Sequence, residues 1–262
     1  KRKYTSRLDF KLFCVIYLFV KDIYFLSGVF RCGNTLLRSI LNQNPNIYLG
    51  SNSLTPEIVY RLHLIKDSFA EESNNHKFLE NVIKNTFNNY YKDIKKDYII
   101  DQGRWGTPGN CLLLKKYKFL PKKFIFLERP LEEIVGSWIT LERPLDVYSY
   151  CDTLFSENGR IGQAALALNY LTKNYKKNLH IIKYKNLCKN PQKTIKDLYD
   201  FLNIPHFNHR FKNLDQVDTS LAQTTIRTNV IKQKKYNYKK IVPREILEKH
   251  KEINEMFKKY GT

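Results

Sequence analysis

The chain has 262 residues and a mass of 31.2 kDa, enough to bury the core of one α/β domain. Its formal net charge of +20 attracts anionic partners, but no zinc-like Cys and His spacing and no recognisable nucleic-acid module supports binding to nucleic acid. The five cysteines are odd in number and scattered, which favours a reduced compartment over a disulfide framework.

The first 22 residues are expected to form an extension before a domain over residues 23–262. They contain a basic start and an apolar stretch of nine residues from Leu12 to Val20, which is too short to span a bilayer. The stretch fits the remnant of a signal or anchor segment, or an amino-terminal strand or helix. We expect a cytoplasmic protein without a membrane span.

Apolar runs alternate with helical patterns from about residue 21 to residue 202. This alternation predicts a single α/β domain with a mostly parallel central sheet flanked by helices. Strands are expected near 23–27, 98–101, 123–127 and 179–184, helices near 34–42, 75–92, 131–140, 161–176 and 192–202, and a closing helix from Pro243 to about Tyr260.

The first strand leads into a glycine-containing loop and a helix. Gly28 and Gly33, followed by Thr35, have the spacing of a phosphate-binding loop, although Asn34 stands where an ATP or GTP hydrolase needs lysine. Arg31 supplies the fixed positive charge instead. Backbone N–H groups and the helix dipole then point at one phosphate or sulfate. The alternative is an ordinary turn between a strand and a helix.

The segment from Phe25 to Arg38 resembles the 5′-phosphosulfate loop of sulfotransferases that use 3′-phosphoadenosine 5′-phosphosulfate (PAPS). That loop usually reads Pro-Arg-Ser-Gly-Ser/Thr-Thr-Leu-Leu, and three positions of this chain depart from it, namely Phe30, Cys32 and Asn34. The resemblance implies a P-loop-like fold. It also implies donor binding by six consecutive residues: Arg31, Cys32, Gly33, Asn34, Thr35 and Leu36.

A second segment contains Arg129 at the end of a predicted buried strand and Ser137 eight positions later on a predicted helix. In an open α/β sheet, ligands bind beyond the carboxyl ends of the strands, where an arginine grips phosphate bidentately. The segment resembles the family's 3′-phosphate motif. The alternative is an exposed arginine and a serine that faces solvent.

Glu128 leaves a kinase open as an alternative, because four apolar residues and an acid are also typical of a strand that holds Mg²⁺. The missing loop lysine argues against this interpretation. Sulfuryl transfer from PAPS needs no metal, so we expect none.

Two later segments also resemble the family. Tyr184, at a predicted strand end, matches a tyrosine that lies by the adenine, although Lys185 and Asn186 replace the usual acidic pair; otherwise it is a core aromatic residue. In the tail, Thr228 and Lys232 match residues that contact the nucleotide. Arg227 is then expected at the 3′-phosphate or the acceptor, and the alternative is a basic, solvated loop.

The general base is not evident from the sequence. The stretch from Gly50 to Ser53 lacks the glutamate of tyrosylprotein sulfotransferases, and residues 98–108 lack the histidine of small-molecule sulfotransferases. We therefore predict Asp101 as the base and Arg104 as a cation beside the sulfate, with Arg31 taking up charge on the leaving phosphate. Glu57 and His63 are reserve candidates for the base. The alternative is that Asp101 caps a turn and Arg104 is a surface group.

Together these resemblances imply a sulfotransferase that moves a sulfuryl group from PAPS to a hydroxyl of a carbohydrate or other acceptor, leaving 3′-phosphoadenosine 5′-phosphate (PAP). Two alternatives remain open at this point. One is a P-loop nucleotide-dependent kinase, and the other is a non-catalytic binder of an anionic polymer.

Overall fold

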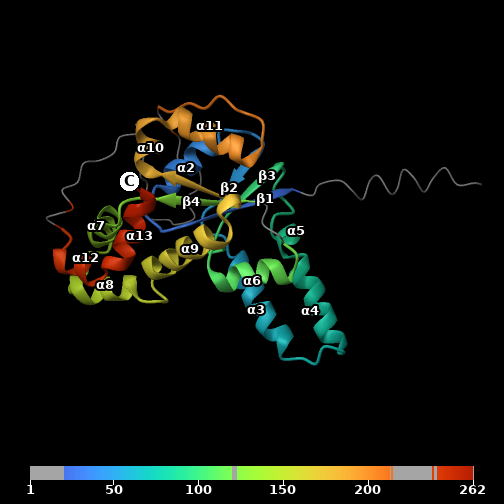
Figure 1. Ribbon diagram of the computed structural model, residues 1–262. Coiled ribbons are helices and arrows are strands. Elements are labelled where there is room, and N and C mark those ends of the chain that lie inside the picture. Colours follow the sequence, from blue (N-terminus) through green and yellow to red (C-terminus); the bar gives the residue numbers. More distant parts are fainter. Residues whose placement is uncertain (1–20, 120–122, 213, 215–237, 239–240, 262) are drawn as a thin grey trace, which may run out of the picture.

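A five-stranded, all-parallel sheet forms the centre of the protein (Figure 1). The computed structural model describes residues 21–119, 123–212, 214, 238 and 241–261. The strand order is β2-β3-β1-β4-β5, which confirms the predicted α/β fold. The strands are β1 (Asp22–Gly28), β2 (Ile47–Leu49), β3 (Tyr98–Gln102), β4 (Phe124–Glu128) and β5 (Leu179–Lys183).

Helices cover both faces of the sheet (Figure 1). Side chains that alternate along the strands enter two hydrophobic clusters: Leu26 packs in the cluster that contains Leu37 of α2, and Phe25 packs in the one that contains Leu168 of α9. The helices are α2 (Asn34–Leu41), α3 (Thr55–Asp67), α4 (Asn74–Lys84), α5 (Thr86–Tyr90), α6 (Pro108–Lys116), α7 (Leu131–Glu142), α8 (Val147–Phe155), α9 (Arg160–Asn174), α10 (Tyr184–Lys189), α11 (Pro191–Leu202), α12 (Arg244–Lys249) and α13 (Lys251–Gly261).

The four predicted strands and most of the predicted helices are confirmed to within two residues. The helix expected over 75–92 is two helices, because the backbone leaves the helical conformation at Asn85. The closing helix is likewise interrupted at His250. Five strands and α-helices lie outside the predicted ranges: β2, α6 and α8 are short, α3 (Thr55–Asp67) follows the second strand, and α10 occupies what the sequence indicated as a polar loop.

Within the described ranges, no helix combines the length and the apolar character needed to cross a membrane. The expected amino-terminal extension lies almost wholly outside those ranges.

The parallel arrangement places the carboxyl ends of neighbouring strands at one edge of the sheet. Gly28, Gln102 and Glu128 end the three central strands β1, β3 and β4. The register pairs Leu26 with Gln102 and Gly28 with Leu127. The loop after β1 therefore begins beside the ends of both neighbouring strands, which is where ligands bind in such sheets.

A substitution at Gly28 tests how tightly this edge of the sheet is packed. Its φ is +137°, and a Cβ would lie 2.9 Å from the Leu127 carbonyl oxygen. We expect Gly28→Ala to lower the free energy of unfolding, measured in urea, by about 1–3 kcal/mol. Gly109→Ala on α6 is the control, because a Cβ there meets no atom within 4 Å, and it should be neutral or stabilising by up to about 1 kcal/mol. Equal effects of the two substitutions would contradict this account.

Candidate active site

The loop between β1 and α2 is shaped to receive an anion. Arg31 and Gly33 have positive φ values of 76° and 103°, and Gly33 occupies the N-cap position of α2 in a left-handed conformation. Gly33 has no side chain that could cap this helix, and the first turn of the helix contains no acidic residue. The amino-terminal N–H groups of α2 and the positive end of its dipole thus remain available to a ligand.

Arg31, Arg129 and Ser137 meet at this loop. Arg31 Nε donates a hydrogen bond to Ser137 Oγ at 3.0 Å, and Arg129 Nη1 donates to the Arg31 carbonyl oxygen at 3.0 Å. Burial, and then the neighbouring Arg129, lower the pKa of the Arg31 guanidinium. Two segments that are 106 residues apart in sequence therefore build one cationic site, and a bound anion would relieve the repulsion between its two arginines.

Two tyrosine rings flank the Arg129 guanidinium. Its central carbon lies 4.5 Å from the ring centre of Tyr184 and 5.9 Å from that of Tyr238. Nη2 donates to the Tyr238 hydroxyl at 3.3 Å, and Nε donates to Glu133 at 2.7 Å. Arg129 is consequently held in one orientation by several partners.

Both tyrosines pack where a glycine leaves room. A Cβ on Gly33 would lie 2.5 Å from the Tyr184 ring, and a Cβ on Gly136 would lie 2.1 Å from the Tyr238 ring. Tyr184 therefore contacts the loop directly. Sequence reasoning missed Tyr238 because no motif surrounds it, although Gly136 inside a helical pattern is a typical signal of close packing.

Two departures from the usual loop sequence have different environments. Cys32 is fully buried, and burial, followed by the charge of Glu128, raises the pKa of its thiol well above the usual range. It therefore remains a neutral packing residue. Asn34 has a buried side-chain oxygen without a hydrogen-bond partner among the described residues, and it lines a neighbouring cavity.

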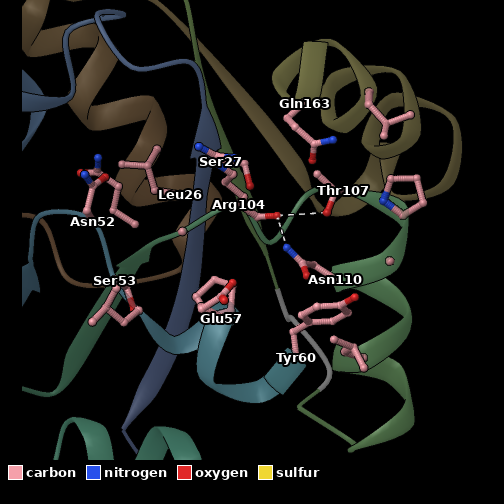
Figure 2. A pocket seen from close by; sticks show the side chains of 18 of the residues that line it. Leu26, Ser27, Asn52, Ser53, Glu57, Tyr60, Arg104, Thr107, Asn110 and Gln163 are labelled. Atoms are coloured by element: carbon pink, nitrogen blue, oxygen red, sulfur yellow. Dashed lines mark hydrogen bonds between the residues drawn. The ribbon is translucent and has the colours of Figure 1, made fainter. Parts of the chain in front are cut away.

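A cavity of about 1050 Å³ adjoins the loop. Ser27, Gly28, Phe30 and Asn34 line it from the loop side, and α3, α6 and α9 supply further walls. Figure 2 shows side chains that line the cavity from α3 (Glu57 and Tyr60), α6 (Asn110) and α9 (Gln163), together with Arg104 from the segment between β3 and α6. A ligand in the cavity would lie next to an anion held by the loop.

Asp101 lies behind the cavity wall. It is fully buried and is not one of the lining residues. Its Oδ2 accepts hydrogen bonds from Thr55 Oγ1 at 2.6 Å, Tyr91 at 3.0 Å and Ser53 at 3.1 Å. Burial raises the pKa of Asp101 to about 6, and the hydroxyl groups oppose this change. This geometry favours a role for Asp101 in holding α3. The assignment of Asp101 as the base stays a prediction.

Arg104, in contrast, lines the cavity. Its carbonyl oxygen accepts hydrogen bonds from Asn110 Nδ2 at 2.7 Å and Thr107 Oγ1 at 3.3 Å (Figure 2). The next residue, Trp105, is fully buried against Phe25. The segment that carries Arg104 is therefore fixed on both sides.

The two reserve candidates for the base also line the cavity. Glu57 accepts a hydrogen bond from Arg61 Nε at 2.6 Å, and both side chains are mostly exposed. His63 Nδ1 lies 2.9 Å from the Tyr117 hydroxyl, and burial lowers the pKa of this histidine. Either group is able to accept a proton from a ligand in the cavity.

Glu128 lies at the end of β4 and is 1% exposed. Neither carboxyl oxygen has a hydrogen-bond partner in the described part of the chain, and burial raises the pKa to about 7. No group of three or more possible metal-binding side chains is found among the residues that the structure describes. The predicted tail residues Arg227, Thr228 and Lys232 lie outside the described residues.

The fold and the loop define an α/β protein of the P-loop-like class, with a cationic loop beside a cavity. The family model described as "Sulfotransferase domain" matches residues 21–260. The chain belongs to this family and is a sulfotransferase. This membership decides against the kinase and the non-catalytic binder.

Solved structures of sulfotransferases resemble the chain. Mouse sulfotransferase SULT7A1 complexed with PAP is 14% identical, with a TM-score of 0.55 over 92% of this chain and 89% of that chain. The sulfotransferase domain of the curacin biosynthetic pathway is 16% identical, with a TM-score of 0.49 over 89% of this chain and 91% of that domain. The sulfotransferase domain of the Synechococcus PCC 7002 olefin synthase is 17% identical, with a TM-score of 0.48 over 71% of this chain and 74% of that domain. The likeness to the mouse enzyme shows the shared fold. A comparison with curated protein sequences gave no match.

Glu128 makes the stability of the protein depend on pH. Because burial raises its pKa to about 7, the folded state binds a proton more tightly than the unfolded state does. Stability is then highest below the ordinary pKa of glutamate and falls as the pH rises through about 7. We expect Glu128→Gln to raise the free energy of unfolding at pH 8 by about 1–3 kcal/mol, and to have a much smaller effect at pH 5.

Urea unfolding at both pH values measures this difference. Glu245→Gln is the control, because Glu245 is exposed on α12. An equal pH dependence in the wild type and the Glu128→Gln variant would show that Glu128 does not titrate in this range.

Proposed function

We propose that the sulfuryl donor is PAPS and that the acceptor is a hydroxyl group of a carbohydrate or another non-protein molecule. The observation that carries the donor proposal is the contact of Arg31 with both Ser137 and Arg129 beside an uncapped helix. These groups offer two adjacent cationic positions, and PAPS carries charge at both its 5′ and its 3′ end. The mouse relative, whose structure contains PAP, supports this choice of nucleotide.

Each predicted donor-site residue has a proposed role. The backbone from Arg31 to Leu36 would hold the 5′-phosphosulfate at the start of α2. Arg129 and Ser137 would hold the 3′-phosphate. Tyr184, which already packs on Gly33 and Arg129, would lie by the adenine. Three tail residues remain proposed as further nucleotide contacts: Arg227, Thr228 and Lys232.

The composition of the cavity wall supports a hydroxyl-rich acceptor. Amide side chains line the cavity at Asn52, Asn110, Asn158 and Gln163, together with the aromatic ring of Tyr60. Amides both donate and accept hydrogen bonds, which suits sugar hydroxyl groups. We propose a carbohydrate as the preferred acceptor on this basis.

Transfer requires a base at the acceptor and cations at the leaving group. We propose Glu57 as the base, because its carboxylate lines the cavity whereas that of Asp101 does not. Glu57 would take the proton from the attacking hydroxyl. Arg104 would face the sulfate from the cavity side, and Arg31 would compensate charge that forms on the leaving phosphate. His63 remains the second candidate for the base.

Replacing Arg129 tests the 3′-phosphate assignment. We expect Arg129→Ala to weaken PAP binding about 10–100-fold, because a charge-assisted phosphate contact is lost. Binding of adenosine 5′-phosphate, which lacks the 3′-phosphate, should weaken much less. Calorimetry with the two nucleotides measures both values, and Arg143→Ala, at an exposed arginine, is the control. Equal losses for both nucleotides would remove the assignment. Wild-type protein that binds ATP in preference to PAP would reject PAPS as the donor.

Two carboxylate variants separate the base from the residue that holds α3. We expect Glu57→Gln to lower kcat at least about 100-fold, within the range for general-base catalysis, with unchanged PAP affinity. Asp101→Asn should lower stability by about 1–3 kcal/mol, because it disturbs a buried hydrogen-bond network, and should change kcat less. Transfer of labelled sulfate to saccharides gives kcat, and urea unfolding gives stability. A large loss of kcat in Asp101→Asn with little change in Glu57→Gln would assign Asp101 as the base. A large loss of kcat in His63→Ala alone would assign His63.

A further inference from the structure

Arg38 is a buried arginine whose side chain reaches the carboxyl end of the sheet. It lies on α2, is 7% exposed, and donates from Nη2 to Gln102 Oε1 at 3.2 Å. Gln102 is the last residue of β3 and pairs with Leu26 of β1, two residues before Gly28. The Arg38–Gln102 pair therefore lies at the boundary between the donor loop and the cavity.

The chemistry of arginine fixes the orientation of the Gln102 amide. A guanidinium carries only hydrogen-bond donors, so the amide oxygen must face Arg38 and the NH₂ group must face away from it. Gln102 is 8% exposed and lines the cavity together with Gly28 and Asn34. Its Nε2 makes no hydrogen bond to another described residue. This NH₂ group is thus the part of the side chain available to a ligand.

The Gln102 NH₂ group lies where the reaction needs a further hydrogen-bond donor. Asn34 replaces the lysine of other phosphate-binding loops, and Arg31 already donates to Ser137. A buried cation hydrogen-bonded to the amide oxygen polarises the N–H bonds and makes them stronger donors. We propose that Gln102 is a catalytic residue that donates from Nε2 to an oxygen of the transferred sulfuryl group, and that Arg38 is a positioning residue that holds the amide.

This inference rests on PAPS as the donor. In the transfer, the acceptor oxygen forms a bond to sulfur while the bond from sulfur to the bridging phosphate oxygen breaks. The phosphate leaves with the electron pair, and the acceptor proton goes to the Glu57 carboxylate. A donor that is already oriented toward the sulfuryl oxygens stabilises this transition state without reorganisation.

Two substitutions at Gln102 test the catalytic role. Gln102→Met removes the amide at similar size, and Gln102→Glu keeps a partner for Arg38 but provides no N–H donor. We expect each to lower kcat about 100-fold, the usual effect of losing one such donor. PAP affinity of the uncharged Gln102→Met variant should change less than threefold, because PAP has no sulfuryl group. Gln43→Met is the control and should leave kcat unchanged, since Gln43 bonds to the Arg210 carbonyl outside the cavity.

A double-variant cycle tests whether Arg38 acts through Gln102. Arg38→Met should lower kcat about tenfold, and Arg38→Lys should recover part of the loss. The double variant of Arg38→Met with Gln102→Met should be no slower than Gln102→Met alone, whereas a purely structural Arg38 would give additive losses. Circular dichroism and thermal unfolding check folding. If Arg38→Met does not fold, the same cycle is run with Arg38→Lys.

The outcomes separate this inference from the donor proposal. If the wild type turns over PAPS and both Gln102 variants keep kcat within twofold of the wild-type value, the proposed role of Gln102 is overturned and the donor proposal is not. Parallel losses of kcat and PAP affinity in Gln102→Met would also overturn it, because they would place Gln102 in nucleotide binding. A wild type that binds PAP but transfers no sulfate from PAPS would overturn the donor proposal and this inference with it.

Discussion

The hydrogen bond from Arg129 Nη1 to the Arg31 carbonyl is the contact on which the cationic site at the loop after β1 depends. It joins the end of β4 to the middle of the loop after β1. Arg31 has a positive φ of 76°, which is unfavourable for a residue with a side chain and costs about 1 kcal/mol or more. This backbone conformation lets the carbonyl face Arg129 while the guanidinium reaches Ser137. The strained residue and the two neighbouring cations are thus held in place before any anion arrives.

Tyr184 and Tyr238 extend this contact to other parts of the fold. Tyr184 begins α10, directly after β5, and lies against both Gly33 and Arg129. Tyr238 packs on Gly136 of α7 and accepts a hydrogen bond from Arg129. Displacing Arg129 would therefore disturb packing at the loop, at α7 and at α10. This coupling explains how one side chain orients segments that are distant in sequence.

The strand-loop-helix around Gly28 and the approach of Arg129 and Ser137 to it were predictable from the sequence, because both depend on local patterns and on a topological rule. Gly28, Gly33 and Thr35 have a recognisable spacing, and parallel strands bring their carboxyl ends together. Asp101 and Gln102 were not predictable in the same way. Adjacent strand residues point to opposite faces, and the register pairs Asp101 with Phe25 but Gln102 with Leu26. Both side chains are buried, but a difference of one residue decides which of them lines the cavity, and the sequence alone does not show which face of β3 meets the cavity.

These two residues connect the end of β3 to a different helix on each face of the sheet. Asp101 bonds Ser53 and Thr55 at the start of α3, and this helix supplies Glu57 to the cavity wall. Gln102 accepts a hydrogen bond from Arg38 on α2, the helix that follows the loop after β1. The cavity wall at α3 and the helix α2 are therefore both fixed to consecutive residues of one strand. In-line transfer requires the acceptor oxygen and the sulfur to be held at a set separation, and a shared rigid strand is the simplest way for this fold to maintain it.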